Sequence, residues 1–255
     1  MPAFRFLAPA LFALALGAAP LPASAQSFSD TERGDIETIV KNYLIAHPEV
    51  LEEAMNELSR RQAAAEAEKH EASVSKNADA IFNSPRGVTL GNKDGDVTFV
   101  EFFDYNCGYC KRAMADMLDL MKADPKLKVV LKEFPVLSQG SVEAAQVAVA
   151  VRMQDPTGKK YLDFHQKLLG GRGAADKARA MAVAKEVGLD MAKLEKDMAS
   201  PEAKATIEEN FKLAEAMGMN GTPSYVIGKQ VVIGAVGIES LKEKIGVARC
   251  GKATC

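Results

Sequence analysis

The sequence predicts an α/β protein with a helical extension at its N-terminus. Two β-rich segments, 97–103 and 127–134, flank a helix with one apolar face, and such a strand–helix–strand unit joins two parallel strands. A series of helices occupies about 141–217, and a hairpin with a Gly-Lys turn follows at 224–233. The parallel unit, the helices and the hairpin together indicate the α/β class.

The composition is that of an ordinary globular protein of 255 residues, with 47% hydrophobic and 26% charged side chains. This length allows one substantial core and a smaller module. The formal net charge is only −2, so neither nucleic acid nor an anionic membrane surface is indicated as a partner. Four cysteines are too few for a disulfide scaffold, so the core must form by burial of apolar side chains.

Residues 1–25 have the features of a secretory signal peptide. Arg5 precedes an apolar run over 7–19, and an Ala-x-Ala sequence ends at Ala25. Two prolines interrupt the run before it reaches the about 20 residues that a membrane-spanning helix needs. We therefore expect cleavage, export and no membrane anchor.

Residues 26–76 predict a helical extension. Ser29 or Asp30 can cap a first helix, and Pro48 is well placed as the first residue of a second, much longer one. One narrow stripe recurs every seven residues, at Leu44, Leu51, Leu58 and Ala65. Such a stripe suits self-association, and it equally suits a helix that lies on its own domain.

Residues 77–247 form the expected catalytic domain. Turn-forming clusters at 83–87 and 92–96 enclose a short strand at 88–90. Segment 97–103 is apolar on both faces, as a buried central strand is. The later helices are expected at about 141–154, 159–169, 174–187, 191–199, 201–217 and 238–245, which leaves 248–255 as a C-terminal tail.

The sequence Cys107-Gly108-Tyr109-Cys110 follows the buried strand and opens the next helix. A cysteine at a helix N-terminus lies beside unpaired backbone N–H groups, which lower the pKa of its thiol. Cys110 lies one turn further along the same side, where it can resolve a mixed disulfide. The pattern predicts thiol–disulfide exchange with Cys107 as nucleophile.

Two stretches, FVEFFDYNCGYCK and GTPSYVIG, resemble the DsbA-like branch of the thioredoxin superfamily. The resemblance covers about 85–247. It implies a thioredoxin fold with a helical domain inserted at about 139–218. It also implies location in the periplasm, where exported cysteine-containing proteins are the substrates.

The same resemblance implies roles for three further residues. Thr222-Pro223 matches the family's cis-proline position, which is implied to present a backbone edge to a substrate strand beside Cys107. Glu101 matches an acidic residue implied to handle the proton of Cys110 from a buried site, with Lys132 as a candidate partner. An ordinary turn and an edge-exposed glutamate are the alternatives.

The direction of the reaction depends on the dipeptide between the cysteines. Gly-Tyr is similar to the motif of the disulfide isomerase DsbC, whereas strongly oxidising DsbA proteins have Pro-His. With the N-terminal helices, the chain most resembles the ScsC group. This resemblance implies an oligomer, with a trimer favoured, and copper tolerance as the physiological context. We expect an isomerase or reductase with a DsbD- or ScsB-like membrane redox partner; a DsbA-type oxidase is the alternative.

A binding protein is the alternative from another class, with zinc or copper held by thiolates. Zinc would need all four cysteines, including Cys250 and Cys255 in the tail. We expect these two instead to form a local structural disulfide, and we expect no cofactor. The three histidines, His47, His70 and His165, show no mutual spacing and are expected at the surface.

Overall fold

The structure is a computed structural model that describes residues 28–255. The expected signal peptide, 1–25, lies outside the described residues. The chain divides into two compact units, residues 1–58 and 59–255, which we describe separately. Within the described part of the chain, no helix has both the length and the apolar character required to cross a bilayer.

Two helices make up the N-terminal extension. Helix α1 (Asp30–Ala46) begins with a capping box, in which the Ser29 Oγ accepts from the Glu32 N–H and the Glu32 carboxylate accepts from the Ser29 N–H. His47 ends α1, and α2 (Glu49–Lys76) follows directly. No residue of α1 is buried, so its apolar side chains face solvent in a single chain.

The second unit contains a five-stranded sheet with strand order β1-β3-β2-β4-β5. Strands β2 and β3 are parallel, and every other pair is antiparallel. The predicted α/β class and thioredoxin fold are confirmed. The strands are β1 (Val88–Gly91), β2 (Val97–Phe103), β3 (Leu127–Glu133), β4 (Ser224–Ile227) and β5 (Gln230–Ile233).

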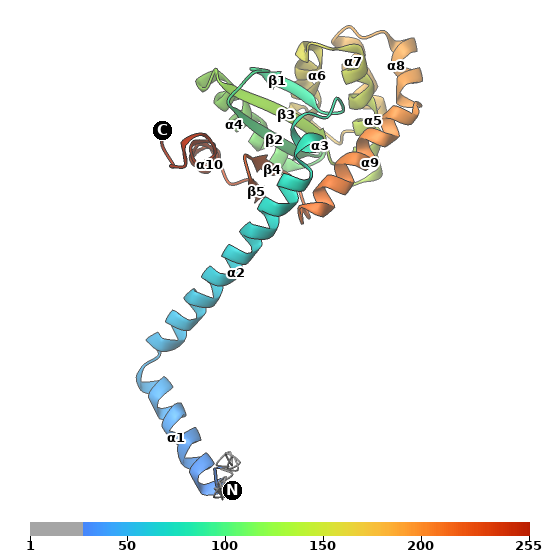
Figure 1. The fold of residues 1–255 in the computed structure, drawn as a ribbon. Helices are drawn as coiled ribbons and strands as arrows, with labels where there is room; N and C mark the ends of the chain where they lie inside the picture. Colours follow the sequence, from blue (N-terminus) through green and yellow to red (C-terminus); the bar gives the residue numbers. More distant parts are fainter. Residues whose placement is uncertain (1–27) are drawn as a thin grey trace, which may run out of the picture. The chain divides into compact units, whose positions relative to one another are not determined.

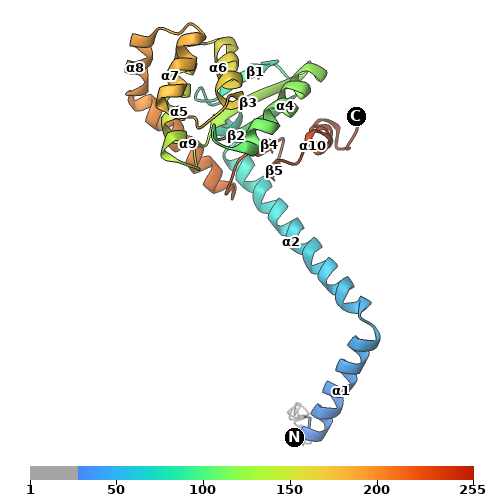
Figure 2. The ribbon, with the colours of Figure 1, turned by 180° about the vertical axis from the view of Figure 1, so that it is seen from behind.

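A group of five helices separates β3 from β4 in the chain and lies beside one end of the sheet (Figures 1 and 2). Helix α5 is at its centre and contacts the other four; its many alanines and valines are buried. We call this group the helical insertion. Its helices are α5 (Gln139–Gln154), α6 (Lys159–Gly170), α7 (Lys177–Glu186), α8 (Met191–Met198) and α9 (Pro201–Ala216).

Side chains of the sheet alternate between two apolar layers. One layer packs against α4 (Gly108–Ala123) and α10 (Ile238–Cys250) and includes Phe99 and Leu131. The other packs against the end of α2, α3 (Ala78–Phe82) and α9, and includes Val130. Each fully buried side chain of this size contributes roughly 1.5–3 kcal/mol.

The last helix is longer than the sequence predicts. We expected it to end at Ile245, whereas α10 continues to Cys250. Gly246 lies inside the helix because the tail returns over it: a Cβ there would lie only 2.5 Å from the Ala253 carbonyl oxygen. The helix ends instead at Gly251, whose φ of 77° is the left-handed conformation that favours glycine.

Candidate active site

Cys107 is the N-cap of α4. Its Sγ accepts a hydrogen bond from the Cys110 N–H at 3.3 Å, as a capping side chain does. Interaction with the Cys110 thiol is the main cause that lowers the pKa of Cys107, to about 5, and the backbone N–H groups of Tyr109 and Cys110 add to it. At neutral pH Cys107 is therefore a thiolate, the form that attacks disulfides.

Cys110 lies one turn deeper in α4 and is completely buried. Burial raises the pKa of its thiol far above the ordinary value, and the neighbouring Cys107 adds to the rise. Cys107 and Cys110 are both free thiols in the structure, so the pair is in its reduced form. The Cys107 thiol is therefore much more acidic than the Cys110 thiol. Thiol–disulfide exchange requires this difference, because the nucleophile must be ionised while the resolving thiol waits in its protonated form.

The Thr222-Pro223 bond is cis and lies immediately before β4. In its protonated form the Cys107 thiol donates to the Thr222 carbonyl, with the Sγ 3.2 Å from the oxygen. The structure thus brings together the two motifs that the sequence analysis singled out.

Glu101 lies in the middle of β2 and is 2% exposed. Its neighbours across the sheet are Leu131 on β3 and Tyr225 on β4, and all three belong to the face that α4 covers. Burial raises its pKa to about 8, and the nearby charge of Cys107 contributes. Glu101 is therefore protonated near neutral pH and can exchange a proton in the physiological range.

Lys132 is not the partner of Glu101, contrary to the sequence-based expectation. It follows Leu131, the register neighbour of Glu101, so its side chain points to the opposite face of the sheet. There its Nζ donates to the Ala80 carbonyl at 2.9 Å and lies 3.9 Å from the Glu209 carboxylate.

Residues 98–246 match the DsbA-like thioredoxin domain family. The chain belongs to this family. Residues 32–65 match the copper resistance protein ScsC N-terminal domain, so the predicted resemblance to the ScsC group is confirmed. The matched domain is therefore a thiol–disulfide oxidoreductase domain of the DsbA/ScsC type.

Three solved structures illustrate the similarity. A thioredoxin-like oxidoreductase from Silicibacter pomeroyi is 45% identical and covers 67% of this chain and 96% of its own, with a TM-score of 0.64. A linker-deletion mutant of Proteus mirabilis ScsC is 26% identical and covers 88% and 98%, with a TM-score of 0.65. A periplasmic thioredoxin-like protein from Salmonella enterica serovar Typhimurium is 27% identical and covers 68% and 95%, with a TM-score of 0.59.

Among curated proteins, a Na⁺/H⁺ antiporter NhaA 1 of Salinispora arenicola is 24% identical over 65% of this chain. The match spans 25% of that protein. The chain thus spans about a quarter of the length of the first curated relatives that it matches.

A buried polar cluster in this DsbA-like domain was missed by the sequence analysis. The Tyr161 hydroxyl on α6 donates to the Glu133 carboxylate at the end of β3 and lies 3.4 Å from the Tyr105 hydroxyl. His165 joins the cluster, with its Nδ1 3.4 Å from the same Tyr105 oxygen. Its expected surface position is wrong: His165 is 1% exposed because its ring packs against Phe103 and the two tyrosines.

Tyr109, between the two cysteines, is a large exposed side chain, at 60%. The Arg112 guanidinium lies 4.4 Å from the centre of its ring, a cation–π contact. Val136 and Leu137, which follow β3, are also exposed apolar residues.

The structure pairs Cys250 with Cys255 in a disulfide, within a loop that starts at the last residue of α10. The four cysteines therefore form two separate pairs. Within residues 28–255, no group of three or more histidine, cysteine, aspartate or glutamate side chains is arranged to hold a metal ion.

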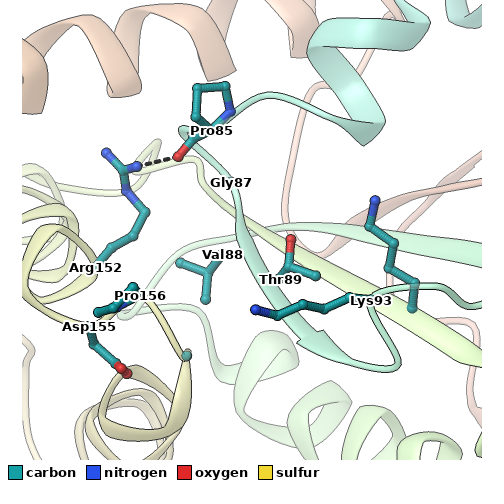
Figure 3. A pocket seen from close by; sticks show the side chains of 10 residues that line it. Pro85, Gly87, Val88, Thr89, Lys93, Arg152, Asp155 and Pro156 are labelled. Carbon is teal, nitrogen blue, oxygen red and sulfur yellow. Dashed lines mark hydrogen bonds between the residues drawn. The ribbon is translucent and has the colours of Figure 1, made fainter.

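One pocket of about 310 Å³ lies between β1 and the helical insertion (Figure 3). Lys93, Arg152 and Asp155 are among its lining residues, and the Arg152 guanidinium donates to the Pro85 carbonyl. Neither redox cysteine lines it, so it is separate from the reactive centre.

Proposed function

We propose that the protein is a periplasmic disulfide isomerase or reductase that acts on exported cysteine-containing proteins. The Cys107 thiolate attacks a substrate disulfide, which forms a mixed disulfide and releases one substrate thiolate. In isomerisation, that thiolate attacks another disulfide of the substrate, and the thiolate released there attacks the mixed disulfide, which forms the new substrate disulfide and frees Cys107 as a thiolate. In reduction, Cys110 loses its proton and attacks Cys107, which yields the Cys107–Cys110 disulfide and a reduced substrate.

The observation that carries the proposal is the pairing of a stabilised Cys107 thiolate with a buried Cys110 thiol beside Thr222. The Cys107 pKa of about 5 lies between the values near 7 of thioredoxin and near 3.5 of DsbA. Gly-Tyr lacks the imidazole that adds thiolate stabilisation in Pro-His motifs. The absence of that imidazole favours a less oxidising centre than the one in Pro-His proteins.

In this proposal the N-terminal extension assembles the protein into an oligomer, with a trimer as the favoured form. The exposed apolar side chains of α1 and α2 can form the contact between copies, because burying them stabilises an assembly. Several reactive centres around one substrate raise the effective concentration of Cys107 at its wrong disulfides. The exposed residues are Ile36, Ile39, Val40, Tyr43, Ile45, Leu51, Met55 and Leu58.

An isomerase must be kept as a dithiol in an oxidising compartment. We infer a membrane redox partner of the DsbD or ScsB kind that reduces the Cys107–Cys110 disulfide. The signal-like segment at 1–25 supports export to the compartment where this partner is needed.

The decisive experiment compares mass and isomerase activity in one set of variants. Leu51→Lys and Leu58→Lys together place charges in the apolar stripe, and Asn56→Lys adds the same charge at an exposed polar position of α2. We expect the double variant to be monomeric by light scattering. It should still exchange disulfides with a small substrate but lose most refolding of scrambled ribonuclease, whereas Asn56→Lys keeps both.

A monomeric wild-type protein that only oxidises reduced substrates would overturn this proposal and favour a DsbA-type oxidase. The low pKa of Cys107 is the observation behind that alternative, because a stabilised thiolate favours the dithiol and makes the disulfide more oxidising. An equilibrium titration with glutathione gives the redox potential that separates the two. Metal analysis of the reduced protein tests the copper- or zinc-binding alternative.

A further inference from the structure

Asn106, the residue before Cys107, is bonded to two segments of the helical insertion. Its Nδ2 donates to the Ala175 carbonyl at 2.8 Å and to the Ser141 Oγ at 2.9 Å. Its Oδ1 accepts from the Ala175 N–H at 2.7 Å. Both amide hydrogens are therefore used, and Ala175 is paired through both of its backbone groups, as in a strand ladder.

The partners of Asn106 belong to a closely packed part of the insertion. Ser141 is 0% exposed in the first turn of α5, and Ala175 is 2% exposed. A Cβ at Gly140 would lie only 3.1 Å from the Ala175 carbonyl oxygen, so α5 and the Ala175 segment approach each other as closely as a glycine allows. Asn106 is thus fixed to a rigid support.

The loop that carries Asn106 is also closed on itself. The Cys107 N–H donates to the Asp104 carbonyl at 3.1 Å, and the Asn106 N–H donates to the Asp104 carboxylate at 2.7 Å. The same carboxylate accepts from the Leu137 N–H at 3.0 Å. Tyr105 reaches α6 through ring contacts with Phe164 and His165 and through long, 3.4 Å contacts of its hydroxyl. Asn106 therefore supplies the short hydrogen bonds between this loop and the insertion.

The position of the loop matters because the groups that contact the Cys107 sulfur lie outside the loop. The sulfur accepts from the N–H of Cys110 on α4 and lies beside Thr222 on another segment. A small displacement of the Cys107 backbone weakens these interactions, since hydrogen bonds weaken steeply with distance and angle.

We propose that Asn106 is a positioning residue for thiol–disulfide exchange: by binding the reactive loop to Ser141 and Ala175, it holds the Cys107 sulfur where the α4 N–H reaches it. The Asn106 side chain bonds to the insertion and not to the reacting sulfur, so its effect passes through the backbone. The proposal makes the helical insertion a determinant of thiolate stability.

The test is a pH titration of thiolate ultraviolet absorbance on the reduced full-length protein. Asn106→Ala should raise the midpoint of Cys107 by about one pH unit, the equivalent of one hydrogen bond to a charged group. Ser141→Ala, which removes one acceptor, should shift it less in the same direction. Asn92 is the matched control, because its side chain bonds the Pro125 carbonyl and the Asp94 N–H away from the cysteines. Asn92→Ala should leave the midpoint unchanged.

An unchanged midpoint in Asn106→Ala, or an equal shift in Asn92→Ala, would overturn the proposal. If Asn106→Ala does not fold, Ser141→Ala decides: it removes one acceptor of the Asn106 side chain without changing any charge near Cys107, and an unchanged midpoint there would overturn the proposal. The assignment of the nucleophile is tested separately. If the Cys107→Ser variant still catalysed thiol–disulfide exchange, that assignment would be wrong, but the titration result for Asn106 would not be affected.

Discussion

The Cys107 Sγ lies 3.2 Å from the carbonyl oxygen of Thr222, a residue 115 positions later in the chain. The Thr222 hydroxyl is buried and has no hydrogen-bond partner among the described residues. Thr222 also contributes to the low pKa of Cys107. The hydroxyl is thus available to donate to the sulfur once Cys107 is ionised.

Thr222→Val removes this donor at nearly constant volume. We expect the pKa of Cys107 to rise from about 5 by about one unit, because a hydrogen bond to the charged form is lost. Thr222→Ser keeps the hydroxyl and should keep the low pKa. Titration of thiolate absorbance measures both, and a valine variant that titrates like the wild type would contradict the role of the hydroxyl.

The two cysteines should behave differently towards alkylation. With limiting iodoacetamide, Cys107 should be labelled first, at a rate that rises through about pH 5 and then levels off, since only the thiolate reacts. Cys107→Ser should abolish exchange, and Cys110→Ala should accumulate mixed disulfides. Peptide mapping that finds the label mainly on Cys110 would reverse the assignment.

Glu101→Gln should slow the resolution of mixed disulfides more than the initial attack. In its ionised form, a buried carboxyl near Cys110 can take the proton that this thiol must lose before it attacks, and an amide cannot. Stopped-flow measurement of the two phases separates the steps. Equal slowing of both phases would count against a proton-handling role.

The same variant should gain stability at alkaline pH. The pKa of Glu101 is raised to about 8 in the folded protein from an ordinary value of 4.5, so the folded state binds more protons between these values. Stability therefore falls as pH rises from about 4.5 to 8, by at most about 1.4 kcal/mol for each pH unit in that range. Glu101→Gln removes this loss. Urea unfolding at pH 5 and pH 8 should show the variant gaining relative to wild type only at pH 8.

Local sequence patterns were enough to predict those parts of the reactive centre that lie within a single helix or strand. The CxxC helix start and the buried strand each have a signature within a few residues, whereas the cis-proline at Thr222-Pro223 was predicted from the family resemblance and not from its own local sequence. Lys132 could not be assigned correctly, because the face of a strand on which a residue lies depends on pairing register. Glu101 and Lys132 lie on opposite faces although their strands are neighbours.

Asn106 and His165 were missed for a different reason. Each makes contacts with residues far away in sequence, Ser141 and Ala175 for Asn106 and Tyr105 for His165. A polar side chain in a polar-looking segment gives no sign of such partners. His165 does lie on the face of α6 that also carries Tyr161 and Leu168, and this helical spacing was a signal of burial that could have been used.

The Cys250–Cys255 disulfide should contribute locally to stability and not to catalysis. It closes a loop with a sequence separation of 5 at the end of α10, which limits the entropic stabilisation to about 2 kcal/mol. A Cys250→Ser and Cys255→Ser double variant should lose about that much in urea unfolding and should exchange disulfides at the wild-type rate. A strong loss of exchange would show that the tail pair takes part in the reaction.

The boundary of the extension gives a last prediction, because the C-terminal part of α2 belongs to the core of the second unit. Val74 is 2% exposed and packs with Ile81, and the Ser73 hydroxyl donates to the Ala216 carbonyl at 2.5 Å. Deleting residues 27–58 should therefore leave a folded, active domain. Deleting 27–75 removes both contacts and should destabilise it.

Val74→Ala in the full-length protein tests the same point without a truncation. It should lower the free energy of unfolding by about 1–3 kcal/mol, since a buried side chain is cut back and a cavity remains. Leu58→Ala is the matched control, because Leu58 is 55% exposed and lies in the other unit. Denaturant titration should find the domain unaffected by the control when both proteins are measured at a concentration where they are monomeric. Equal losses in the two variants would show that α2 contributes to the domain along its whole length and that residue 58 is the wrong place to divide the chain.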